Sequence, residues 1–307
     1  MKQSTKAVAA VVLSGILWGV ISLFVNGLND AGLDSMEICA VRMAVAALFS
    51  LAFLAFCSPG KLKIRPRDLW FFIGTGIVSV ALFNALYFRA IVESGASVAA
   101  VLLYTSPVFV AVMSAMLFKE RLTPRKVLIL AGILVGCVLV TGLLEQGSLV
   151  MTPAALLCGI GSGFFYALYT IFARFALKRY SSETVSVYTF LMAAIGSMLM
   201  RSPVATWQKL VLQPRFLWLA LGIGLICSAL PYFLYTWGLE RMESGKAAGL
   251  VAVEPLMGAL MGVVVFHENL SLLQILGTLL VLGAIVALGL RGSGETPECP
   301  VAKEGSH

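Results

Sequence analysis

Long apolar stretches alternate with short polar segments along the whole chain. A helix that crosses a bilayer needs about 20 predominantly apolar residues, and the charged or Pro/Gly-rich breaks divide this chain into stretches of that length. Ten such stretches cover residues 7–28, 35–57, 69–91, 97–118, 126–143, 152–177, 184–200, 216–239, 247–266 and 272–290. The pattern predicts an all-α membrane protein with ten transmembrane helices.

Composition supports this fold class. Hydrophobic residues make up 60% of the chain, charged residues 12%, and the mean hydropathy is +0.96, whereas roughly a quarter of the residues in a soluble domain are charged. A soluble core needs a charged surface, but a bilayer accepts apolar side chains on the outside of a helix bundle. We therefore expect a multi-pass protein of the bacterial cytoplasmic (inner) membrane.

Lysine and arginine are distributed unevenly over the predicted loops. With the N-terminus inside the cell, the cytoplasmic segments would hold about 17 of these residues and the other side about four, as the positive-inside rule requires. The pattern predicts that both termini are cytoplasmic, which agrees with an even number of helices. The net charge of +7 then reflects loop anchoring, so no nucleic-acid partner is expected.

The second half of the sequence repeats features of the first. Gly74, Gly76, Leu82, Leu86 and Tyr87 recur at a constant offset of 148 as Gly222, Gly224, Leu230, Leu234 and Tyr235. Further repeats are Glu93-Ser94-Gly95 with Glu243-Ser244-Gly245, Pro107 with Pro255, and Glu120-Arg121-Leu122-Thr123 with Glu268-Asn269-Leu270-Ser271. We expect one repeat in residues 1–145, a second in 146–291, and a polar cytoplasmic tail in 292–307. Because each repeat holds five helices, an odd number, the second would be inverted, as in secondary transporters.

Several motifs resemble those of EamA-type transporters of the drug/metabolite transporter superfamily. They are Leu17-Trp18-Gly19, Arg42, the Ser106-Pro107 and Glu254-Pro255 pairs, and the repeated Glu-x-Leu-Thr/Ser. The resemblance covers residues 7–290. It implies a ten-helix bundle in which helices one to four and six to nine surround a central cavity, with five and ten packed outside. Members of this group carry amino acids, aromatic compounds, quaternary amines, sugars or nucleotide derivatives, so the resemblance names no solute.

Glu254 is the only acidic side chain well inside a predicted span. It lies seven residues from Ala247, about 10 Å into the membrane at 1.5 Å per residue. A carboxylate at that depth needs a polar cavity, a partner or a proton, so Glu254 is a candidate for substrate or proton binding. Alternatively, it would cap backbone groups freed by Pro255 or pair with Arg42.

Two prolines inside predicted spans, at equivalent positions of the two repeats, are candidate gating residues. Pro107 and Pro255 each remove one backbone hydrogen bond and clash with the carbonyl four residues earlier, which predicts a kink in each helix. Such a kink would act as a gate hinge between two rocking halves, or as a static bend.

Aromatic and polar side chains at corresponding depths form a candidate substrate-binding set. Tyr and Trp combine a flat apolar face with one hydrogen-bonding group, which suits an aromatic amino acid or, through cation–π attraction, a quaternary amine. The same residue types also form belts at membrane interfaces. The set comprises Trp18, Asn84, Tyr87, Tyr104, Ser106, Tyr166, Tyr169, Tyr232, Tyr235 and Trp237, together with Glu254.

Three charged residues are interpreted as structural. Arg42 is deep enough in the second span to need a partner, and we expect it to hold the bundle together. Glu120 and Glu268 occur in both repeats just before helix-capping patterns, and features kept in both halves favour a scaffold role.

These observations predict a secondary transporter that moves a small organic metabolite by alternating access. Amino-acid export is the first interpretation; choline-like amine uptake and efflux of drugs or toxic metabolites are the alternatives. An intramembrane enzyme would need converging His, Asp, Ser or metal ligands, so we expect no enzymatic activity, metal or cofactor. The expected partners are the substrate and the lipid bilayer, with the chain as a monomer or homodimer. Substrate, direction and coupling ion stay open.

Overall fold

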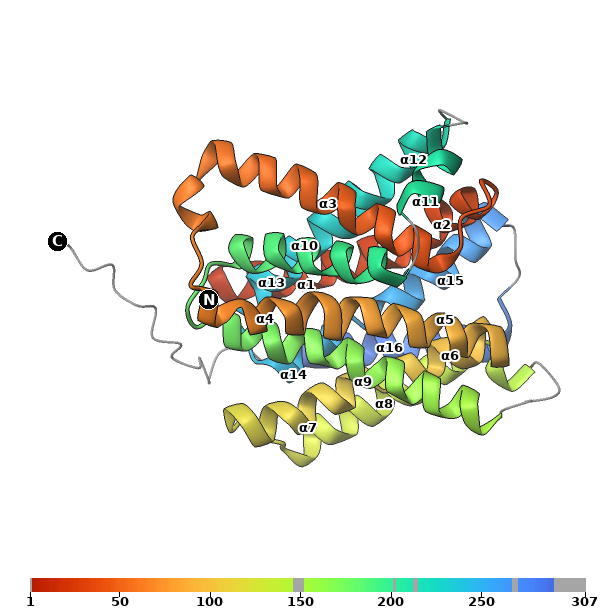
Figure 1. Ribbon diagram of the computed structural model, residues 1–307. Helices are drawn as coiled ribbons and strands as arrows, with labels where there is room; N and C mark the ends of the chain where they lie inside the picture. Colours follow the sequence, from red (N-terminus) through yellow and green to blue (C-terminus); the bar gives the residue numbers. More distant parts are fainter. Residues whose placement is uncertain (1, 146–151, 201–202, 212–214, 267–269, 290–307) are drawn as a thin grey trace.

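The computed structural model describes residues 2–145, 152–200, 203–211, 215–266 and 270–289. Within these ranges the chain forms helices and connecting turns and no strand, and the helices lie alongside one another in a bundle (Figure 1). The predicted tail, 292–307, lies outside the described residues.

The helices of the first half follow the predicted stretches. They are α1 (Lys2–Gly19), α2 (Ile21–Asn29), α3 (Ser35–Cys57), α4 (Leu69–Ile73), a π-helical segment (Gly74–Ala81), α5 (Leu82–Ser94), α6 (Ala96–Leu103), α7 (Ser106–Phe118) and α8 (Pro124–Val140). Short 3₁₀ turns cover Pro59–Leu62, Pro66–Asp68 and Leu143–Glu145.

The second half has the same order of elements, except that its first span is one continuous helix where the first half has α1 and α2, and that one helix is added. Its helices are α9 (Pro153–Ala176), α10 (Ser182–Met200), α11 (Pro203–Val211), α12 (Arg215–Gly224), a π-helical segment (Leu225–Ala229), α13 (Leu230–Leu239), α14 (Ser244–Leu250), α15 (Val253–Phe266) and α16 (Leu272–Gly289). The added helix is α11, for which the first half has no counterpart.

Nine helical segments in the described ranges are long and apolar enough to cross a membrane. They coincide with nine of the ten predicted stretches. The remaining stretch holds α8, which has 17 residues. The chain is therefore a multi-pass membrane protein.

The two candidate gating prolines lie at breaks between helices, not inside kinked helices as expected. One helix ends at Leu103 and the next begins at Ser106; the second break lies between Leu250 and Val253. Pro107 is the second residue of α7 and Pro255 the third residue of α15. Proline is tolerated in a first helical turn because the amide hydrogen it lacks would have no partner in the helix there.

Helices α8 and α16 pack closely because glycines face each other. A Cβ atom added to Gly277 would lie 2.8 Å from the Gly136 carbonyl oxygen and 2.8 Å from the Val140 backbone nitrogen. Small residues at such crossings let two helix backbones approach. By contrast, a Cβ atom added to Gly283, on the same helix, would meet nothing within 4 Å.

We expect the Gly277→Ala variant to melt several degrees below the wild-type protein in detergent. The added methyl group must push two backbones apart, and such overpacking costs about 1–3 kcal/mol. Gly283→Ala is the matched control and should melt at the wild-type temperature or above, because alanine favours a helix. Equal melting temperatures for the two variants would contradict this packing.

Polar contacts tie the loops together at each end of the bundle. The basic end, where the chain begins (Figure 1), consists of loops 58–68, 119–123, 177–181 and 240–243. There Lys61 pairs with Glu183 at 3.1 Å. At the opposite end, Lys209 on α11 donates to both carboxylate oxygens of Glu37, at 2.8 and 2.7 Å. The extra helix α11 thus fastens to the start of α3.

Candidate functional site

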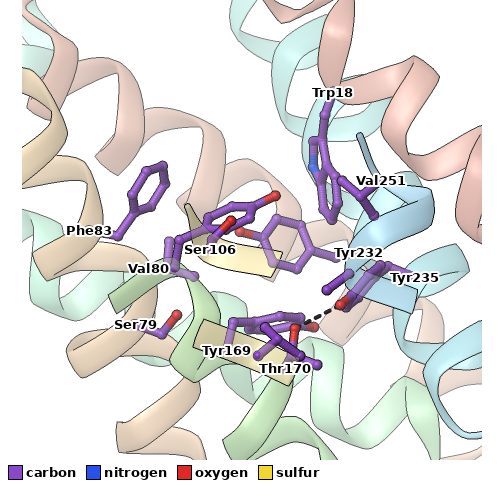
Figure 2. Close-up of a pocket in the computed structure, with 13 residues that line it drawn as sticks. Trp18, Ser79, Val80, Phe83, Ser106, Tyr169, Thr170, Tyr232, Tyr235 and Val251 are labelled. Atoms are coloured by element: carbon purple, nitrogen blue, oxygen red, sulfur yellow. Dashed lines mark hydrogen bonds between the residues drawn. The ribbon is translucent and has the colours of Figure 1, made fainter. Parts of the chain in front are cut away.

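A small cavity lies between the two halves of the chain (Figure 2). Elements of the first half (α1, the π-helical segment 74–81, α5 and α7) face elements of the second half (α9, α13 and the α14–α15 break). The lining residues are Trp18, Ser79, Val80, Phe83, Ser106, Val110, Tyr166, Tyr169, Thr170, Tyr232, Tyr235, Ala248 and Val251. Six of them belong to the predicted set: Trp18, Ser106, Tyr166, Tyr169, Tyr232 and Tyr235.

The aromatic walls are built from edge-to-face contacts. The ring of Tyr232 lies 5.2 Å from that of Trp18 and 5.1 Å from that of Tyr169, measured between centroids, with interplanar angles of 79° and 90°. This arrangement directs the positive edge of one ring at the negative face of another. It holds α1, α9 and α13 around the cavity.

Two tyrosine hydroxyls are held by threonines on the facing helix. The Tyr169 and Thr236 hydroxyl oxygens are 2.7 Å apart, and so are those of Thr170 and Tyr235 (Figure 2). These bonds join α9 to α13 and satisfy four polar groups. The Tyr166 and Tyr232 hydroxyls make no hydrogen bond within the described part of the chain and are available to a ligand.

Glu254 lies beside the cavity and does not line it. It is three residues beyond Val251, is partly exposed, and makes no side-chain hydrogen bond or ion pair with the described residues. It therefore does not cap the backbone near Pro255. Tyr87, Tyr104, Tyr166 and Tyr232 are close enough to interact with its charge.

Arg42 on α3 supplies a positive charge near this group. Its side chain is 7% exposed and lies close to those of Cys39 and Tyr232. The Arg42 guanidinium is close enough to interact electrostatically with Glu254, but the two side chains form no ion pair within 4 Å. Tyr166 and Tyr232 interact with both charges. One carboxyl group and one guanidinium group thus lie near the same two tyrosines without pairing.

The other members of the predicted set do not line the cavity. Asn84 uses its side-chain amide within its own helix, donating to the Val80 carbonyl at 2.7 Å. Tyr87 packs on Phe83 with ring centroids 5.8 Å apart. Tyr104 lies at the α6–α7 break within reach of the Glu254 charge. Trp237 lies under the Arg241 guanidinium, 4.2 Å from the ring centroid, close to the basic end.

Seven lining residues were missed by the sequence analysis. They are Ser79, Val80, Phe83, Val110, Thr170, Ala248 and Val251. Small and apolar residues of this kind are also the usual content of a buried span, so their types give no signal of a cavity.

Glu120 links the two halves at the basic end. Its carboxylate accepts hydrogen bonds from the backbone amides of Ser244 and Gly245, at 2.8 and 3.2 Å. The Lys126 ammonium lies 2.8 Å from the Glu243 carboxylate and 3.8 Å from that of Glu120. Glu268, the counterpart of Glu120 in the second repeat, lies outside the described residues.

The helix caps predicted next to these glutamates are present. The Thr123 hydroxyl accepts from the Lys126 amide at the start of α8. The Ser271 amide donates to the Gln274 side chain and the Gln274 amide to the Ser271 hydroxyl, at 2.9 and 3.2 Å, before α16. This reciprocal pair is a capping box.

Comparison with known proteins gives a consistent result. The model of the EamA-like transporter family matches residues 5–142 and again 153–290. An uncharacterized transporter of Archaeoglobus fulgidus is 30% identical, over 91% of this chain and 94% of the relative. An uncharacterized inner membrane transporter, YicL of Salmonella typhimurium, is 25% identical, over 94% and 97%.

Two further matches concern function and fold. The threonine/homoserine exporter RhtA of Escherichia coli is 27% identical, over 82% of this chain and 80% of the relative. One solved structure superposes with a TM-score of 0.75 at 18% identity, covering 92% of this chain and 96% of the other. At that identity the likeness concerns the fold alone.

Proposed function

This chain belongs to the EamA-like transporter family, and we propose that it exports a small amino acid across the cell membrane. The name of RhtA, a threonine/homoserine exporter, supports this class of solute. The observation that carries the proposal is a carboxyl group, Glu254, and a guanidinium group, Arg42, near the same two tyrosines with no ion pair between them.

An amino acid has the complementary charges. Buried ionised groups are costly unless they find a partner, and a zwitterion brings one partner for each. The substrate ammonium group would lie at Glu254, with tyrosine rings around it, and the carboxylate at Arg42. Charge-assisted hydrogen bonds of this kind are roughly twice as strong as neutral ones.

Alternating access would use the two repeats. We take α8 as the tenth span, which gives two inverted five-helix halves with both termini in the cytoplasm and the basic end facing it. The breaks at Pro107 and Pro255 lie next to cavity residues Ser106 and Val251. They are therefore placed to serve as hinges when one half rocks against the other.

Counterflow into proteoliposomes tests this function. Vesicles loaded with unlabelled amino acid should take up external labelled threonine saturably, and vesicles without protein should not. A panel of the common amino acids and choline would define the range. If no amino acid shows counterflow, the proposed function is wrong.

A quaternary amine is the second candidate, favoured by the four tyrosines around Glu254. Tyrosine faces attract a cation through the ring quadrupole, and such a substrate would need no contact with Arg42. Choline counterflow in the absence of threonine counterflow would select this alternative.

A further inference from the structure

The Ser79 hydroxyl is a buried polar group with no partner. Its side chain is 1% exposed, and its oxygen makes no hydrogen bond with any residue that the structure describes. A hydroxyl buried without a hydrogen bond is unfavourable by about 1–3 kcal/mol. The residue lines the cavity, so a ligand there can supply the missing bond.

Other buried hydroxyls in and near this segment are hydrogen-bonded. Serine and threonine in helices commonly bond to a carbonyl of the preceding turn. Thr75, in the same π-helical segment, donates to the Phe72 carbonyl at 3.2 Å, and Ser162 donates to the Gly159 carbonyl at 2.6 Å. Three other buried serine hydroxyls lack a partner (Ser50, Ser114 and Ser244), and none of them lines the cavity.

Two serine hydroxyls of the first half line the cavity. In Figure 2, Ser79 lies across the space from Trp18 and Val251, the residue three positions before Glu254. Ser106, whose hydroxyl also makes no hydrogen bond among the described residues, lines the cavity as well.

The second repeat has other groups at the positions of these serines. At the offset of 148, Ser106 corresponds to Glu254 and Ser79 to Cys227. Cys227 lies close enough to Arg42 to interact with its charge. The second half therefore has a carboxyl group and a thiol at the two positions where the first half has hydroxyls, and the guanidinium of Arg42 comes from the first half.

We propose that Ser79 is a specificity residue that hydrogen-bonds a polar side chain of the transported amino acid. This inference rests on the proposed function. With the amino acid in the cavity, its side chain would meet the Ser79 hydroxyl in the cavity wall. A hydroxyl side chain completes the bond that Ser79 lacks, whereas an apolar side chain of the same shape leaves it unmade. A site built for a hydrogen bond rejects the analogue without it.

Threonine and valine provide the test because they are nearly the same size and shape. Unlabelled threonine and valine would compete with labelled threonine for counterflow in proteoliposomes. For wild-type protein, valine should need on the order of 10-fold higher concentration than threonine for half-inhibition. In the Ser79→Ala variant valine should compete at least as well as threonine to within about twofold, because the threonine hydroxyl loses its partner and valine leaves no hydroxyl unpaired.

Ser114→Ala is the matched control. It removes another buried hydroxyl without a partner, on α7 and away from the cavity, so the preference for threonine should stay at the wild-type value. Ser79→Ala should also melt no lower than wild type, because alanine removes an unsatisfied group.

The outcomes separate this inference from the function on which it rests. Counterflow of threonine and valine with equal affinity in wild-type protein overturns the role of Ser79 and leaves amino-acid transport standing. The role of Ser79 is also overturned if Ser79→Ala keeps the wild-type preference for threonine over valine, or if the variant binds both amino acids more weakly by the same factor. If no amino acid shows counterflow, both amino-acid transport and the role of Ser79 are overturned.

Discussion

The Glu254→Gln variant is expected to lose amino-acid transport. Glutamine keeps the shape of the side chain and removes the charge that would bind the substrate ammonium group. Hydrogen bonds to charged groups contribute about 1.5–3 kcal/mol, which corresponds to roughly a 10- to 100-fold weaker affinity. Thermal-shift titration with threonine would measure the affinity, and counterflow in proteoliposomes the transport.

Glu240→Gln is the control for this change. Glu240 pairs with the neighbouring Arg241 at the basic end, at 2.5 Å, and lies outside the cavity. We expect wild-type affinity from that variant. If Glu254→Gln binds threonine as tightly as wild type, the carboxylate does not bind the substrate.

The Glu120→Ala variant is expected to show the largest loss of stability at the basic end. The substitution removes the acceptor of the Ser244 and Gly245 backbone amides. It also removes one of the two carboxylates beside the Lys126 ammonium, whose side chain is 10% exposed. Breaking a buried ionic group of this kind costs about 3 kcal/mol. The melting temperature in detergent should fall by several degrees.

Glu183→Ala is the matched comparison for Glu120→Ala. The Lys61–Glu183 pair joins the two halves at the same end, but the side chains are 44% and 37% exposed. Exposed pairs of this kind contribute about 0–1 kcal/mol. Similar melting temperatures for the two variants would show that the Glu120 contact does not hold the halves together.

The contact at Glu120 also bears on alternating access. In the proposed mechanism, opening of the basic end would separate Glu120 from α14. The structure has this contact made. The loops that meet there come from different halves of the chain, as a gate between two rocking halves requires.

Most of the fold could be predicted from the apolar stretches. Hydrocarbon tolerates helices and excludes unpaired backbone, so long apolar stretches in a membrane leave few structural choices. The helix breaks were harder: proline predicts an interruption, but whether the chain bends at Pro107 or starts a new helix depends on packing. The π-helical segments had no recognised signal at all.

The site was partly predictable for a physical reason. Tyr232 and Trp18 are conspicuous in an apolar span because each carries a polar atom that needs a partner. Asn84 is conspicuous for the same reason, but it finds its partner in its own helix. Ser79 is inconspicuous in the sequence, because a serine hydroxyl in a helix usually donates to a carbonyl of the preceding turn. Only the structure shows that the Ser79 hydroxyl makes no such bond.

Trp18 allows the most direct test of where the substrate binds. It lines the cavity, whereas Trp218 is 77% exposed on the outer surface. Threonine titration should change the tryptophan emission of the wild-type and Trp218→Phe proteins saturably, and should leave that of Trp18→Phe unchanged at saturating threonine. A saturable change of undiminished size in Trp18→Phe would place the binding site outside the cavity and contradict the account.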